Sequence, residues 1–168
     1  MTKRNILSCI LAVVLVFTVT ISCNTYPITI KPVLIAEGDR FNGDKGNSVI
    51  KTQAEWDNLI NVHCSQYFSN ATICRQYFVD KNIDFDMFQI IAVIDGTRPQ
   101  LNWSINIVSI KEYSDDIVVS IYIKAPKGPA PDALSQPYQI VKIPVTAKDV
   151  VFEYINFIPP LDLGEGML

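Results

Sequence analysis

The only histidine of the chain is the first residue to examine for catalysis. Any histidine-dependent reaction must use His63, because the sequence contains no other. Trp56, Leu59, Ile60 and His63 recur at the spacing of one helical face, and His63 ends this apolar stripe. A packing side chain, or a favourable charge near a helix C-terminus, is therefore the simpler interpretation.

Two pairs of carboxylates offer another route to catalysis, because a glycosidase needs only two acidic side chains. Asp84 and Asp86 flank Phe85 where a strand begins, and Asp115 and Asp116 belong to a turn. Solvated structural carboxylates explain both pairs more simply. The sequence has no nucleophile elbow, zinc-protease helix motif, phosphate-binding loop or dinucleotide fingerprint. We therefore expect a protein that is not an enzyme and needs no cofactor, with a carboxylate-dependent envelope hydrolase as an alternative.

The first residues have the layout of a secretory signal. Lys3 and Arg4 precede an apolar run from Ile6 to Ile21, and the small Ser22 stands just before Cys23. The segment from Thr20 to Cys23 resembles a bacterial lipobox, although Thr20 stands where Leu or Val is usual. An ordinary signal peptide with a chance cysteine remains the alternative. We expect a lipoprotein signal peptide over residues 1–22 and lipidation at Cys23.

Lipidation would place the mature protein in the cell envelope, held on a bacterial membrane by acyl chains such as palmitate. Cleavage before Cys23 removes Lys3 and Arg4 and leaves 12 basic against 17 acidic residues, a net charge of −5. That balance argues against nucleic acid as a partner, because binding to phosphates requires a basic surface.

Export also decides how the remaining cysteines are interpreted. Cys9 would leave with the signal and Cys23 would carry lipid, so Cys64 and Cys74 remain as one pair in an oxidising compartment. We expect them to form a disulfide. The alternative is a metal site made by His63, Cys64 and Cys74, but three candidate ligands without a fourth nearby fit neither common structural zinc spacing.

The stretch from Phe85 to Ile110 organises the expected fold as strand, loop and strand. Five consecutive apolar residues, Ile90 to Ile94, indicate a central strand that is buried on both faces. A capping box at Thr52 and Glu55 predicts the start of a helix, and 65–80 reads as either a second short helix or an ordered loop. Further strands are expected at 28–36, 49–51, 105–111, 117–124, 138–145 and 150–158.

These elements predict a single α+β domain over residues 28–160, with a tether at 23–27 and a tail at 161–168. The domain should contain a mainly antiparallel β-sheet of six to seven strands, with one or two helices packed on one face. Because Pro27 and Pro32 cannot donate to a ladder, the first strand should lie at an edge.

Several short segments, in order, resemble a known family. They are Ala54-Glu55-Trp56, Asp84-Phe85, Gly96-Thr97-Arg98-Pro99, and the run from Gln136 to Pro144. Together they resemble the C-terminal domain family of the protease complex regulatory subunit PrcB, over about 49–145. The resemblance implies an accessory, non-catalytic subunit that associates with an envelope protease.

The chain departs from the family pattern in one loop. Leu101-Asn102-Trp103 stands where the family usually has Gly-Gly-Tyr. Glycine suits a positive φ, and Asn tolerates that conformation better than most other residues. The loop is therefore expected to differ from that of relatives.

Two loops carry the candidate binding residues. They would meet at one end of the sheet if the strands that they connect are antiparallel neighbours, and Trp and Arg are frequent at interface hot spots. Two alternatives stay open: Trp103 as a core residue at the start of its strand, and the proline-rich loop as a plain crossover. The candidate partner-binding residues are Arg98, Pro99, Trp103, Pro126, Pro129 and Pro131.

The expected function is therefore that of an envelope lipoprotein that binds another exported protein, for which a protease is the candidate that the resemblance supplies. Two alternatives to protein binding stay open: the carboxylate-dependent envelope hydrolase and an envelope protein that binds a small ligand.

Overall fold

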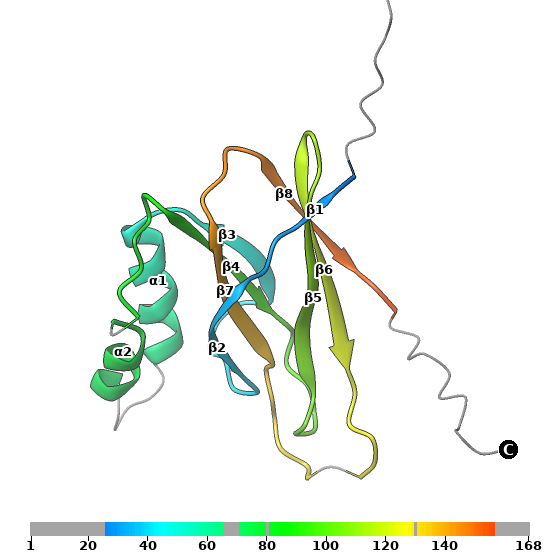
Figure 1. Cartoon of the computed structure of the whole chain (residues 1–168). Helices are drawn as coiled ribbons and strands as arrows, with labels where there is room; N and C mark the ends of the chain where they lie inside the picture. Colours follow the sequence, from blue (N-terminus) through cyan, green and yellow to red (C-terminus); the bar gives the residue numbers. More distant parts are fainter. Residues whose placement is uncertain (1–25, 66–70, 80, 130, 157–168) are drawn as a thin grey trace, which may run out of the picture.

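The protein folds as three layers, with two helices on one face of a central sheet and a second sheet on its other face (Figure 1). The computed structural model describes residues 26–65, 71–79, 81–129 and 131–156. The helices are α1 (Gln53–Cys64) and α2 (Ala71–Val79). The strands are β1 (Ile28–Thr29), β2 (Val33–Gly38), β3 (Gly46–Ile50), β4 (Phe88–Ile94), β5 (Ser104–Glu112), β6 (Asp116–Lys124), β7 (Tyr138–Pro144) and β8 (Asp149–Tyr154).

The strands form two four-stranded sheets. The central sheet has the order β2-β7-β4-β3, and the outer sheet has the order β1-β5-β6-β8. Neighbouring strands are antiparallel except β6 and β8, which are parallel. The α+β class with mainly antiparallel strands is therefore confirmed, but the described residues contain eight strands, divided between two sheets.

The first expected strand, 28–36, accounts for part of this difference. It is divided at Lys31 and Pro32 into β1, at the edge of the outer sheet, and β2, at the edge of the central sheet. Proline has no N–H to donate to a ladder, so the chain can leave one sheet and join the other at this point. Both pieces are edge strands, as the prolines predicted.

Strand β4 is buried on both faces, as its apolar run predicted. Ile90, Ala92 and Ile94 belong to the core under the helices, whereas Ile91 and Val93 belong to the core between the sheets. Alternate side chains of a strand point to opposite faces, so a continuous apolar run suits a strand in the middle layer. Its neighbours β3 and β7 make it internal to the central sheet.

Helix α1 begins at the predicted capping box. The backbone N–H of Glu55 donates to Thr52 Oγ1 at 3.2 Å, and Glu55 Oε2 accepts from the backbone N–H of Thr52 at 3.1 Å and of Lys51 at 2.8 Å. The bond from Lys51, followed by those from Thr52, holds the pKa of Glu55 below its usual value. Trp56 of this helix is buried against Phe78 of α2 in an edge-on contact.

The second helix resolves the choice left open for 65–80, since α2 occupies 71–79. No helix among the described residues is long and apolar enough to cross a membrane. The expected signal peptide, Cys23 and the tail at 161–168 lie outside the described residues.

Candidate partner-binding site

The two loops that carry the candidate binding residues are joined by backbone hydrogen bonds. The N–H of Arg98 donates to Ser135 O at 2.7 Å, and the N–H of Ser135 donates to Arg98 O at 3.0 Å. Leu101 N–H donates to Pro131 O at 3.2 Å, and Ser135 Oγ donates to Gln100 O at 2.6 Å. The β4–β5 and β6–β7 connections therefore form one surface at the end of the molecule that lies lowest in Figure 1.

Arg98 is held in place by a buried carboxylate. Its Nε lies 2.7 Å from Oδ2 of Asp95, whose side chain is 0% exposed, and Lys45 Nζ lies 3.7 Å from Oδ1 of the same carboxylate. The backbone N–H of Gly96 donates to that Oδ1 at 2.7 Å. Fixed in this way, the Arg98 guanidinium lies 4.5 Å from the centre of the Trp103 ring.

Sequence reasoning missed the part that Asp95 plays. An Asp that directly follows a buried strand is typical of a turn, and its spacing to Arg98 was the available signal of an ion pair. Because Arg98 is bound through both backbone and side chain, it positions the loop in addition to contributing to its surface.

Trp103 lies directly before β5, and its burial is compatible with both alternatives that the sequence left open. The residue is partly buried, and its Nε1 is buried without a hydrogen-bond partner in the part of the chain that the structure describes. The preceding Asn102 has φ 66°, the left-handed conformation that the family's glycines would favour. Asn102 therefore adopts here a conformation that glycine favours.

Exposure differs among the candidate prolines and reveals one further residue. Pro99, Pro129 and Pro131 are exposed, whereas Pro126 is partly buried. Leu134, which sequence reasoning did not single out, is 73% exposed in the same loop. The signal was available, because Leu134 is a large apolar residue between proline-rich sequence and a strand.

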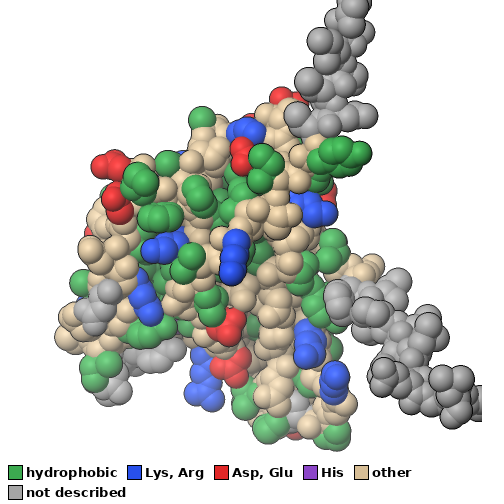
Figure 2. Space-filling model, in the orientation of Figure 1, with side chains coloured by type: hydrophobic (Ala, Val, Ile, Leu, Met, Phe, Trp, Pro, Cys, Tyr) green, Lys and Arg blue, Asp and Glu red, His purple; other side chains and the backbone are tan. Residues whose placement is uncertain are grey.

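A hollow of about 450 Å³ lies beside Trp103, between the end of β2 and the starts of β5 and β7. Its wall includes Glu37, Asp39 and Tyr138, and among the described residues no Lys or Arg lines it. Figure 2 shows acidic side chains near the end of β2. The hollow therefore has an acidic rim beside an aromatic surface.

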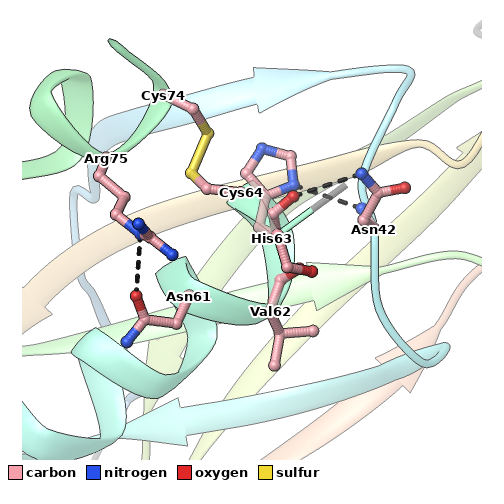
Figure 3. The surroundings of a disulfide bond; sticks show 8 residues. Asn42, Asn61, Val62, His63, Cys64, Cys74 and Arg75 are labelled. Carbon is pink, nitrogen blue, oxygen red and sulfur yellow. Dashed lines mark hydrogen bonds between the residues drawn. A yellow bond between two sulfur atoms is a disulfide. The ribbon is translucent and has the colours of Figure 1, made fainter. Parts of the chain in front are cut away.

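His63 is a packing residue in this structure. It is 4% exposed and stacks on Phe41, with ring centroids 4.4 Å apart. Its Nδ1 accepts from the backbone N–H of Asn42 at 3.3 Å, and the Asn42 side chain donates to His63 O at 3.3 Å (Figure 3). Burial lowers the pKa of His63 to about 4, so the imidazole is neutral near pH 7.

The expected disulfide is present, because Cys64 of α1 is bonded to Cys74 of α2 (Figure 3). Beside it, Arg75 Nε donates to Asn61 Oδ1 at 3.0 Å, a second link between the helices. The bond uses both thiols of the alternative metal site. The described residues contain no group of three or more metal-ligating side chains.

Of the carboxylate pairs that a hydrolase would need, Asp84 and Asp86 lie just before β4, and Asp115 and Asp116 lie where the β5–β6 turn enters β6. Asp84 Oδ1 accepts from the backbone N–H of Asp86 at 3.0 Å. Asp115 accepts from Ser114 Oγ at 3.1 Å, and Asp116 O accepts from the backbone N–H of Tyr113 at 2.8 Å. These bonds are those of local turn structure.

Comparisons with known proteins bear on this end of the molecule. Neither the search of curated proteins nor that of solved structures found a match to the chain. A family match does exist; it begins in β4, ends in β7 and is narrower than the 49–145 expected from the sequence. It contains both loops of the candidate site and leaves out α1 and α2. Residues 89–144 match the family model described as PrcB C-terminal, and the resemblance to this family is confirmed over that stretch.

Proposed function

We propose that this protein is a non-catalytic accessory subunit of the bacterial cell envelope that binds another exported protein, with an exported protease as the first candidate. The family match supports this role, because PrcB is a regulatory subunit of a protease complex and the matched stretch carries both loops. The observation that carries the proposal is the bonded pair of loops, in which Arg98 and Ser135 hold exposed Pro99 and Leu134 on one surface.

The first described strand lies at the end of the molecule opposite to the joined loops. Ile28 in β1 pairs with Glu112 at the end of β5, whereas the Arg98 loop precedes Ser104 at its start. At about 3.4 Å per residue, these two ends of β5 are roughly 27 Å apart. With 1–22 removed, Cys23 lipidated and 23–27 as a tether, the domain 28–160 would present its joined loops away from the membrane, on its periplasmic or surface side.

The partner should present basic groups to this surface. Glu37 and Asp39 line the hollow beside Trp103, and their carboxylates would complement a cation of the partner. We therefore propose a protein contact in which exposed Leu134 and the prolines supply apolar area and the acidic hollow receives a Lys or Arg side chain.

The test is affinity purification of the tagged full-length protein from detergent-solubilised native envelopes, with mass spectrometry of the proteins that co-elute. We expect a stoichiometric exported protein, with a protease as the first candidate. Leu134→Glu should remove it, because a charge would be placed in the apolar part of the contact.

Ile73→Glu is the matched control, since Ile73 is 68% exposed on α2, far from the joined loops in the fold. It should leave recovery of the partner unchanged. Equal recovery with wild type and Leu134→Glu would contradict this binding surface. Absence of any stoichiometric protein with the wild type would contradict the accessory role itself.

A further inference from the structure

Among the described residues, strand β3 forms an edge of the central sheet, and the Tyr154 hydroxyl of β8 donates to Asn47 Oδ1 of this strand at 3.1 Å. Within the described residues its strand partner is β4, and the register from Gly46 to Ile50 runs without a bulge or a proline. Edge strands expose unpaired N–H and C=O groups, and proteins commonly block them with prolines, bulges or covering segments.

The other edge of the same sheet is blocked in several of these ways. Pro32 directly precedes β2, and the register shifts between Leu34 and Ala36. In addition, Tyr77 Oη of α2 donates to Ile35 O at 3.4 Å. The two edges of the central sheet therefore differ, because β3 contains neither a proline nor a bulge.

A groove of about 460 Å³ runs along the open edge. All five residues of β3 line it, and Leu59 and Val62 of α1 form the wall on the helix side. Phe41 and Ile94 also line this groove and are buried, whereas Val62 is 43% exposed. The groove therefore combines a row of backbone hydrogen-bonding groups with an apolar wall.

We propose that this groove binds an extended polypeptide segment, which adds to the central sheet as a further strand beside β3. Such a segment matches the spacing of the unpaired N–H and C=O groups, as in other cases of strand addition. Alternate side chains would lie against Leu59 and Val62 and should therefore be apolar. Five paired residues cover about 17 Å at the strand repeat.

The groove favours a single segment over the sheet edge of a second folded copy. Residues of α1 and of the loop that contains Phe41 line the groove together with β3, so an approaching strand must fit beside a helix. Of the three charged lining residues, Lys45 pairs with Asp95 and the carboxylate of Glu55 is used in the helix cap, and Asp44 is the third. Arg98 and Trp103 do not line the groove, so this site is separate from the joined loops.

The experiment uses the detergent-solubilised full-length protein and two fluorescent probe peptides. One peptide alternates Val and Thr over seven residues between terminal lysines, and the other has Pro at the central position. We expect the alternating peptide to bind at least tenfold more tightly and to slow hydrogen exchange at the amides of β3. A central proline removes a ladder donor and restricts the strand, so it should weaken pairing.

Two matched variants locate the site. Val62→Glu should weaken binding of the alternating peptide about tenfold, whereas Val108→Glu, at a β5 residue that is 44% exposed, should not change it. Leu134→Glu should also leave it unchanged, so failure here is distinguishable from failure of the proposed function. Equal binding of both peptides, equal loss in both valine variants, or protection of β3 by self-association without peptide would overturn the proposal.

Discussion

His63 is kept neutral by its packing, and this makes its contribution to stability depend on pH. Burial lowers the pKa of His63 in the folded protein from 6.5 to about 4. Below pH 6.5 the unfolded chain therefore takes up a proton that the folded protein does not bind. The free energy of unfolding should fall as pH decreases from 6.5 to 4, by at most roughly 3 kcal/mol from this residue.

The measurement is denaturant unfolding at pH 7, 5.5 and 4.5, for wild type and for His63→Phe. Phenylalanine keeps a ring against Phe41 but does not titrate, and the carboxylates contribute to both proteins alike. The variant should therefore lose less stability than wild type over this range. Parallel pH profiles for the two proteins would show that His63 titrates alike in the folded and unfolded states.

The indole nitrogen of Trp103 gives a second prediction at this scale. Its buried N–H has no partner among the described residues, and an unpaired buried donor costs about 1 to 3 kcal/mol. Trp103→Phe removes that unpaired donor, which should stabilise the fold, and keeps a ring near Arg98. The smaller ring also packs less well, which should destabilise the fold by a similar amount. The free energy of unfolding of Trp103→Phe should therefore lie within about 1 kcal/mol of the wild-type value.

Trp103→Ala, in contrast, removes the ring and should cost about 2 to 3 kcal/mol. Thermal and denaturant unfolding of the three proteins measures both effects. If Phe proved as destabilising as Ala, the N–H would have a bonding role that this arrangement lacks.

Single residues also show how far the sequence could predict the candidate site. The replacement of glycine by Asn102 was compatible with a left-handed turn, because Asn tolerates positive φ. The anchoring of Arg98 was not predictable to the same degree, since Asp95 follows a buried strand and its burial depends on the distant Ser135 loop. Exposure of Leu134 depends on the same long-range contact.

Among the elements, those specified by local pattern were predicted and those set by long-range packing were not. The capping box fixed the start of α1, and the apolar run fixed the central place of β4. Alternation shows which faces of a strand are buried, but it does not show whether a helix or another sheet covers them. The division into two sheets, with β1 and β2 on different ones, was therefore beyond the local signals.

The disulfide is the covalent link between helix α2 and helix α1, which gives a prediction at the scale of elements. Phe78 is its one buried residue, and Cys74 bonds it to α1. Replacing Cys64 and Cys74 together by Ser should lower the free energy of unfolding by about 2 to 3 kcal/mol, the entropy of closing so short a loop.

Hydrogen exchange locates this effect. Amides of α2 should exchange faster in the double variant, whereas those of β4, in the middle of the fold, should change only with global stability. Wild type reduced by a thiol is the matched control and should behave like the double variant. Unaltered exchange in α2 would mean that side-chain packing alone holds the helix.

At the scale of the whole molecule, the fold would separate the proposed attachment from the proposed contact surface. The described chain enters at β1, beside the end of β5, and the joined loops lie at the other end of that strand (Figure 1). A long outer sheet therefore acts as a rigid spacer between the proposed anchor and the proposed contact. Membrane attachment would then require no structural change at the joined loops, and partner binding would require none near β1.

This separation predicts that the anchor can be removed without loss of binding. Cys23→Ser should move the protein from the membrane to the soluble fraction of the envelope, because several acyl chains, each contributing about 0.8 kcal/mol per buried methylene, would be absent. The released protein should keep the thermal unfolding of the wild type and should still recover the partner.

Fractionation and mass spectrometry of the N-terminal peptide measure the anchor, and affinity recovery measures the contact. Membrane retention of Cys23→Ser would contradict lipid anchoring, whereas release with loss of the partner would mean that recognition needs the membrane as well as the joined loops.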